Sequence, residues 1–320
     1  MSERIELHDQ TELECEYLEC FLETRCVPQN LFYLLGGATS FAYYRNRDLM
    51  QIAWENEARF LESELSLAED DLWAFVSLGC GNAGPDVSLL HHLVERRNGW
   101  HYYGVDSSAA MLNLAEANLE ALACASHVVL ADFCRDDFSQ ALDQLLAVYD
   151  RRLFAMMGGT FGNFDQRWIA DLLEILIPAG DYLYLDIVPQ YPSDDANASL
   201  RERLAHLPDN LNRFFVDLLE RLEIPMAQGH LISDEHPDEG LNTLRFTFSF
   251  EAEEPTTLQY PQGELDLHPG ERVELLTIRA YDVDRLTTFM ALHGFDLQAT
   301  YIPKASGLKH LWQRLLFKKV

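Results

Sequence analysis

The residues that most clearly suggest a ligand site are three glycines, within GCGNAG at 79–84. They follow an apolar run, 73–78, and a helix-like pattern resumes directly after them. Gly79 and Gly81 allow positive φ and leave no Cβ between main chain and ligand, while Gly84 allows a helix to pack closely on the strand. The N-terminus of that helix offers unpaired N–H groups to an acceptor. The pattern predicts a strand, a glycine turn and a helix that together form the floor of a ligand site.

Two carboxylates follow at the ends of the next two expected strands. Asp106 ends the run 100–106, and Asp132 follows the run 127–131, with Phe133 directly after it. An acid at the tip of the second strand has the spacing at which ribose hydroxyls are bound. A dinucleotide would explain the first acid and leave the second without a standard use. S-adenosylmethionine would explain both, with one acid on the ribose diol and the other on the adenine amino group beside an aromatic wall.

The first acid also has a structural interpretation. Asp106 precedes Ser107 and Ser108, which are expected to cap a helix over 109–122, so it could belong to the cap. Its place at the end of the strand favours cofactor binding instead, with Ser107 beside it at the same edge.

A second motif, GGTFGNF at 158–164, follows the expected strand 153–157. Strand ends of this kind lie at the carboxyl edge of a parallel sheet, where such folds bind their ligands. Asn163 could orient an attacking amine, because its amide both accepts and donates hydrogen bonds. The alternative is a turn-capping asparagine, and Thr160 also has both a structural and a functional interpretation.

The order of the expected elements predicts an α/β fold with an insertion. Strands and helices alternate through a core at 66–188, which predicts a mostly parallel sheet covered on both faces. An N-terminal helical cap is expected at 1–65, an α+β lid with its own small antiparallel sheet at 189–278, and the rest of the core at 279–320. The last part is expected to contain a helix and a final antiparallel hairpin.

Composition limits the partners. The chain has 320 residues, 48% of them hydrophobic, and a formal net charge of −28. Such a charge repels nucleic-acid phosphates and anionic lipid, so neither a nucleic acid nor a membrane is an expected partner. The N-terminus is charged, no apolar run approaches membrane-spanning length, and the cysteine spacing fits no common metal site. A cytoplasmic protein without a bound metal is expected, and the oligomeric state stays open.

Taken together, these motifs resemble class I S-adenosylmethionine-dependent methyltransferases, and more narrowly the histidine-specific Nα-methyltransferase family of the ergothioneine pathway. The resemblance covers nearly the whole chain and is thinnest in the lid. It is carried by these segments: LGCGNAG at 78–84, VDSSAAML at 105–112, ADF at 131–133, MGGTFGNF at 157–164, FY at 32–33 and YYRNR at 43–47.

The resemblance implies a seven-stranded, Rossmann-like sheet with a C-terminal antiparallel hairpin, and it implies roles for individual residues. Asn163 and Tyr43 would meet the substrate amine and act in catalysis. Side chains and backbone on the cofactor side would come from Tyr33, Gly79, Gly81, Gly84, Asp106, Ser107, Asp132, Phe133, Gly158 and Thr160.

The sequence departs from the family pattern near the end of the lid. There the family carries a glutamate and a serine that bind the imidazole ring, and the best alignment places Leu276 and Ile278 at these positions, or Thr277 if it is shifted. Unpaired imidazole nitrogens would each cost about 1–3 kcal/mol, so histidine is not the obvious acceptor. The sequence favours N-methylation of a small-molecule amine, such as an amino acid or a metabolite derived from one. A NAD(P)-dependent oxidoreductase and a cofactor-binding regulatory protein without turnover are the alternatives.

Overall fold

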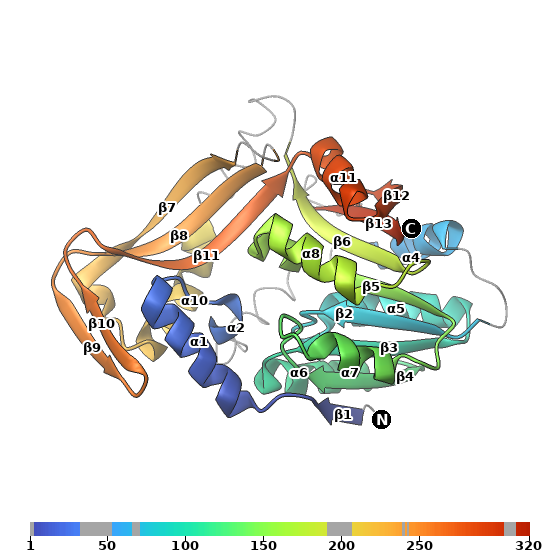
Figure 1. Cartoon of the computed structure of the whole chain (residues 1–320), viewed down its shortest axis with the longest axis horizontal. Helices are drawn as coiled ribbons and strands as arrows, with labels where there is room; N and C mark the ends of the chain where they lie inside the picture. The colour runs from blue at the N-terminus through green and yellow to red at the C-terminus, as the bar shows by residue number, and fades with distance from the viewer. Residues whose placement is uncertain are drawn as a thin grey trace.

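The computed structural model describes residues 3–32, 53–65, 71–190, 207–238, 241, 243–303 and 312–320. Its centre is an 11-stranded sheet, in which seven strands build the predicted core in the order β4-β3-β2-β5-β6-β13-β12 (Figure 1). The first five are mutually parallel, and β13 pairs antiparallel with both β6 and β12. The core strands are β2 (Trp73–Leu78), β3 (Trp100–Asp106), β4 (Ala125–Leu130), β5 (Arg151–Met156), β6 (Tyr182–Pro189), β12 (Phe295–Tyr301) and β13 (Gln313–Lys319).

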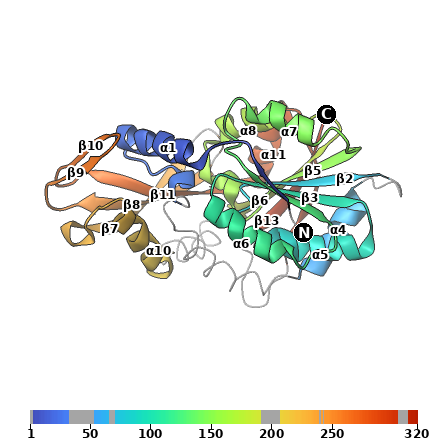
Figure 2. The ribbon, with the colours of Figure 1, turned by 90° about the horizontal axis from the view of Figure 1, so that it is seen from below.

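The central strands are apolar because both faces of the sheet are covered, as parallel sheets require. All residues of β2 and β6 are buried. Three helices cover one face and three cover the other, as the view from below shows (Figure 2). The first set is α4 (Trp54–Glu64), α5 (Gly84–Arg96) and α6 (Ala109–Leu119), and the second is α7 (Phe138–Leu145), α8 (Gln166–Leu176) and α11 (Val283–Leu292).

Side-chain caps fix where several of these helices begin. The Ser108 hydroxyl accepts from the Met111 N–H and starts α6, as the sequence predicts. Asp165 accepts from two amides of the first turn of α8. Asp282 does the same for α11 through the Arg285 N–H. The caps therefore set the lengths of the loops at the ligand edge of the sheet.

The lid is continuous with the core sheet. Strand β11 (Arg272–Tyr281) pairs parallel with the end of β6 at Ala280 and Tyr281, and then antiparallel with β8 (Thr243–Ala252), which pairs with β7 (Gly229–Asp238). The antiparallel sheet predicted for the insert is therefore an extension of the core, and a two-stranded ribbon of β9 (Thr256–Tyr260) and β10 (Gly263–Leu267) lies beyond it.

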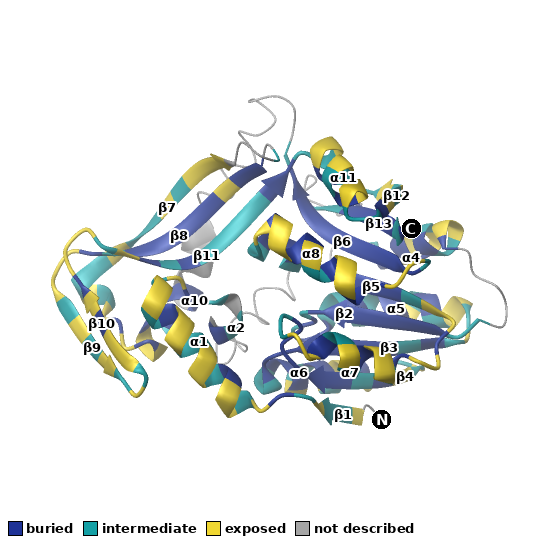
Figure 3. Cartoon of the chain, viewed as in Figure 1, coloured by how far each residue is buried: buried dark blue, intermediate teal, exposed yellow. Residues whose placement is uncertain are grey.

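The apolar face of the lid sheet packs on helices from two distant parts of the chain. Phe246, Phe248 and Phe250 of β8 share a core with α10 (Leu207–Arg221) and with Phe21 of α1 (Gln10–Thr24). A short helix, α2 (Gln29–Phe32), follows α1 beside them, and a single 3-10 turn, η3 (Met226–Gln228), follows α10. The burial colouring shows the dark inner strands with exposed residues on the outer faces of the helices (Figure 3).

The N-terminal segment is more than a helical cap. Residues Glu3–Glu6 form β1, which pairs parallel with β4 and adds a strand to the core edge. Helix α4 (Trp54–Glu64) also belongs to the predicted cap region, whereas Tyr33 and Tyr43 lie outside the described residues. Within the described ranges no helix is both long and apolar enough to span a bilayer.

Candidate active site

The glycine turn has the geometry that the sequence predicts. Gly79 and Gly81 have φ of 70° and 55°, in the left-handed region that favours glycine. A Cβ on Gly79 would lie 2.8 Å from Cγ2 of Thr160 and 3.8 Å from the Phe133 ring. The glycine turn after β2 therefore meets Phe133 and the GGTFGNF turn at one edge of the sheet.

Gly84 and Cys80 have structural roles in this turn. Gly84 is the first residue of α5, and its N–H donates to the Asn82 side chain at 3.1 Å. Burial, followed by the nearby Asp106 and Asp86 carboxylates, raises the pKa of the Cys80 thiol. A thiol of this kind is a poor nucleophile at neutral pH, so Cys80 fills space in the turn.

Asp106 is buried, and its carboxylate accepts hydrogen bonds from the backbone. Oδ2 accepts from the Gly81 N–H at 2.9 Å, Oδ1 accepts from the Ser108 N–H at 2.9 Å, and the Ser107 N–H is a further backbone partner. Burial raises the pKa of Asp106 to about 6, the backbone N–H groups counteract part of this effect, and neighbouring Asp132 adds to it. A carboxylate has about four acceptor positions, so the ionised group can also accept from a ribose hydroxyl. Ser107 lies buried beside it.

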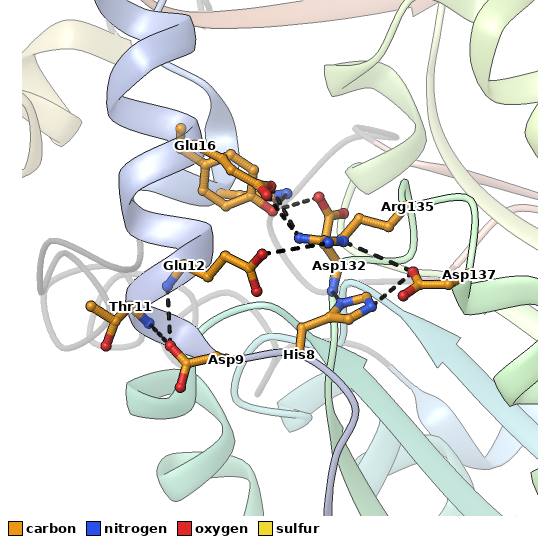
Figure 4. Close-up of polar contacts among 10 residues, drawn as sticks. His8, Asp9, Thr11, Glu12, Glu16, Asp132, Arg135 and Asp137 are labelled. Carbon is orange, nitrogen blue, oxygen red and sulfur yellow. Dashed lines mark hydrogen bonds and ion pairs between the residues drawn. The ribbon is translucent and has the colours of Figure 1, made fainter. Parts of the chain in front are cut away.

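Asp132 is also buried, and two of its partners, Tyr17 and His8, come from the N-terminal segment (Figure 4). Its Oδ2 accepts from the Tyr17 hydroxyl at 2.6 Å, and its Oδ1 accepts from the Cys134 N–H at 2.9 Å. Its own N–H donates to Nδ1 of His8 at 2.9 Å. The aromatic wall predicted beside this acid is Phe133, whose ring makes an edge contact with Phe164 at a centroid distance of 5.6 Å.

The GGTFGNF segment forms a tight turn between β5 and α8. Gly158 and Gly159 have φ of 73° and 82°, and a 3-10 turn, η2 (Thr160–Asn163), follows them. The Thr160 hydroxyl donates to the Met157 carbonyl at 2.8 Å, which is the structural alternative for this residue. Its methyl group lies against Gly79, so Thr160 still borders the predicted cofactor site.

A buried ion cluster holds the start of this turn. The Gly158 N–H donates to Asp186 Oδ2 at 2.8 Å, and the other carboxylate oxygen of Asp186 pairs with Arg314. Arg314 also donates to Glu57 at 3.0 Å, and Tyr184 donates to the same Glu57 oxygen at 2.8 Å. Buried charges need such pairing, so the cluster fixes the turn to β6, β13 and α4.

Strand β11 of the lid lies directly against the η2 turn. The Arg279 guanidinium donates to the Gly162 carbonyl at 3.1 Å, and a Cβ on Gly162 would lie 3.5 Å from the Arg279 carbonyl oxygen. Leu276 and Ile278 are half-buried and pack against the apolar lid core. Trp312 packs there too, and its ring carbons lie 2.9 Å from the position a Cβ would take on Gly159.

The structure therefore brings most of the predicted residues to one edge of the sheet. Asn163 ends the η2 turn, is half-buried, and its side-chain amide has no hydrogen-bond partner among the described residues. Sequence reasoning missed Tyr17, His8, Arg279 and Trp312, because each reaches the site from a distant part of the chain and none lies in a recognisable motif. Tyr33 and Tyr43, predicted at the mouth of the site, lie outside the described residues.

The fold is that of a class I methyltransferase, and a glycine turn and two buried acids lie at the carboxyl edge of its sheet. A family model described as "histidine-specific methyltransferase, SAM-dependent" matches residues 23–184, just over half of the chain. The chain belongs to this histidine-specific, SAM-dependent methyltransferase family, and its cofactor is S-adenosylmethionine. The family therefore decides against the nicotinamide that the glycine turn alone also allowed.

Solved structures of similar shape are also methyltransferases. A SAM-dependent methyltransferase from Methanosarcina mazei has 14% identity and a TM-score of 0.44, covering 82% of this chain and 97% of its own. One from Clostridium acetobutylicum has 11% identity and a TM-score of 0.41, with coverages of 83% and 90%. The glycopeptide N-methyltransferase MtfA, in complex with SAM, has 14% identity and a TM-score of 0.41, with coverages of 83% and 94%. Similarity at this level assigns neither substrate nor mechanism, and no curated protein matches the chain significantly.

The residues at this edge fit the cofactor that the family requires. Gly79 and Gly81 leave space that a Cβ would fill, and the Asp106 carboxylate is held by backbone N–H groups at the same edge. Asp132 and Phe133 lie beside them, one polar and one aromatic, as an adenine requires.

Proposed function

We propose that this chain transfers a methyl group to the amine of a small molecule, an amino acid or a metabolite derived from one, whose side chain is less polar than imidazole. S-adenosylmethionine supplies the methyl group as part of a sulfonium. The chain's own residues bind the cofactor, orient the amine and exclude water, and positioning of this kind lowers a barrier by several kcal/mol.

We assign Asp106 to the ribose hydroxyls and Asp132 to the adenine amino group. Gly79, Gly81 and Gly158 would let the backbone approach the cofactor, with Phe133 and Thr160 as the adjoining wall. The geometry of Asp106 supports this role, because backbone N–H groups of the glycine turn and of the start of α6 hold its carboxylate at the edge of the sheet.

We assign Asn163 to the acceptor amine. It lies at the end of the η2 turn, four residues after the backbone bend at Gly159, and its amide is uncommitted within the described part of the chain. Its oxygen can accept from the attacking amine while its NH₂ donates to a carboxylate of the acceptor. Tyr43 is proposed as a second contact on the resemblance alone.

The observation that carries the acceptor class is the character of β11 where it meets the η2 turn. Arg279 ties this strand to Gly162, and the neighbouring residues on the apolar face of the strand are Ile278 and Leu276. Trp312, which covers Gly159, packs into the same apolar core. Leu276 and Ile278 offer no partner to two ring nitrogens, and the Thr277 hydroxyl between them donates to Glu274, so these positions favour an aliphatic or aromatic side chain.

Two matched variants test the assignment of roles. Asp106→Ala should abolish detectable cofactor binding in a calorimetric titration. Asn163→Ala should bind S-adenosylmethionine within about 2-fold of wild type, because it removes no cofactor contact, and should lower methyl transfer by about 100-fold. Transfer at the wild-type rate by Asn163→Ala would remove that residue from the mechanism, and loss of cofactor binding would move it to the cofactor site.

A further inference from the structure

Helix α1 is joined to the loop after β4 by several polar side-chain contacts. The Tyr17 hydroxyl donates to Asp132 Oδ2 at 2.6 Å and accepts from Asn30 Nδ2 at 3.0 Å. Arg135 donates to both carboxylate oxygens of Glu16 at 3.0 Å and 3.2 Å. Figure 4 shows Glu16 on the helix and Arg135 on the loop, close to Asp132.

His8 holds the backbone of the same acid. Its Nδ1 accepts the Asp132 N–H, so in the neutral ring the proton is on Nε2, which faces Asp137 Oδ1 at 3.1 Å. The Leu7 N–H pairs with the Leu130 carbonyl at 3.0 Å just before this point. The peptide of Asp132 and its side chain are therefore both fixed by the segment 7–17.

The donor that meets Asp132 is a neutral hydroxyl. Asp106 and Asp132 are two buried carboxylates close enough for the charge of one to affect the other. Burial, followed by the Asp132 charge, raises the pKa of the Tyr17 phenol, so Tyr17 stays protonated as a donor.

We propose that Tyr17 is a positioning residue for adenine recognition: it orients Asp132 so that a free lone pair of the carboxylate meets the 6-amino group of the cofactor. This rests on the assignment of Asp132 to adenine made above. The carboxylate has about four acceptor positions, and the Tyr17 hydroxyl, the Cys134 N–H and the Cys134 thiol are its partners. The remaining positions are restricted in direction, and selectivity for a purine that carries an amino group follows from that restriction.

The same helix reaches the lid on its other side. Phe21 packs in the apolar lid core and makes an edge contact with Tyr260 of β9 at 6.4 Å. The segment after the helix pairs with β11, where the Val27 N–H donates to the Glu274 carbonyl at 2.8 Å. Adenine recognition and lid position therefore share one rigid element.

The test is a calorimetric titration of the full chain with two ligands, S-adenosylhomocysteine and its analogue with unsubstituted purine in place of adenine. Wild type should prefer the adenine ligand by about 10-fold or more, since the analogue leaves a buried carboxylate acceptor unpaired. Tyr17→Phe should weaken binding of S-adenosylhomocysteine by about 10-fold and change binding of the analogue by less than about 2-fold.

Two further variants keep the result interpretable. Tyr149→Phe is the matched control, because the Tyr149 hydroxyl bonds to Tyr103 and His101 near the opposite edge of the sheet, and it should leave both affinities unchanged. Asn30→Ala leaves the Tyr17 hydroxyl in place without its Asn30 partner, and should weaken binding of S-adenosylhomocysteine by about 3-fold.

Three outcomes would overturn the proposal. Equal weakening of both ligands by Tyr17→Phe would give the hydroxyl a merely structural role. Tighter binding of S-adenosylhomocysteine would show that the hydroxyl competes with adenine for Asp132. Failure of wild type to discriminate would remove Asp132 from the adenine site, a result that leaves amine methylation and the role of Asn163 intact.

Discussion

Cofactor binding should be coupled to the ionisation of Asp106. Burial raises the pKa of this carboxyl to about 6 from the ordinary value of 3.8, and the Asp132 charge adds to the effect against the Ser108 and Gly81 N–H groups. Ribose hydroxyls donate to the ionised carboxylate, so binding favours the charged form. The protein must therefore release a proton from Asp106 when it binds the cofactor in mildly acidic solution.

The size of the effect follows from the two pKa values. If the pKa returns to 3.8 in the complex, the dissociation constant should be about 10-fold higher at pH 5 than at pH 8, and about 2-fold higher at pH 6. About 0.9 protons should be released at pH 5 and almost none at pH 8.

The folding stability of the free protein depends on pH in the opposite direction. Because the pKa of Asp106 is higher in the folded state, its contribution to stability is fully present below pH 4 and is lost as the pH rises through about 6. The loss is about 3 kcal/mol in the free energy of unfolding, and cofactor binding should restore part of it.

The assay is isothermal titration in pairs of buffers with different ionisation enthalpies, with Asp106→Asn as the control. The variant cannot release this proton, so its weak binding should be nearly independent of pH. Proton uptake, release centred above pH 7, or unchanged release in Asp106→Asn would refute the assignment of Asp106 to the ribose.

Two substitutions test the turn and the acceptor wall. Gly79→Ala places a methyl group 2.8 Å from Thr160 at a φ of 70°, whereas Gly270→Ala has a φ of 86° with no atom within 4 Å. Both variants should lose about 1 kcal/mol of stability to backbone strain. Only Gly79→Ala should also lose cofactor affinity in a titration. Equal cofactor affinity in the two would contradict the role of the glycine turn in cofactor binding. The double variant Leu276→Glu with Ile278→Ser should raise the kcat/KM for histidine relative to a leucine-like amine by about 10-fold or more, and Leu276→Met with Ile278→Val is its apolar control. An unchanged ratio would separate these positions from the acceptor.

Local sequence was enough to predict the cofactor edge. Gly79, Gly81 and the GGTFGNF turn adopt the positive φ that their glycines allow, and Asp106 follows its strand at the expected register. The runs that form β2 and β6 are buried throughout and mostly apolar, since both faces of a parallel sheet are covered. These features depend on residues within a few positions of one another.

The rest of the site depends on contacts that no local pattern encodes. Tyr17 and Asp132 are 115 residues apart, and Arg279 and Gly162 are 117 apart. Tyr17 follows the periodicity of an amphipathic helix, so its hydroxyl gave no sign of a polar partner. Strand β7 was missed because GHLISDEHPD has little apolar alternation, and it is held instead by its pairing with β8.

The most direct test of amine methylation is transfer from methyl-labelled S-adenosylmethionine to an equimolar mixture of amino acids that includes histidine, followed by mass spectrometry. We predict that the label appears on the amine of an acceptor with an aliphatic or aromatic side chain, in excess over labelled histidine, and that Asn163→Ala abolishes it. Label found on histidine above all others would contradict the apolar acceptor wall. Label found on oxygen or carbon, or on no acceptor under conditions in which the cofactor binds, would contradict amine methylation itself.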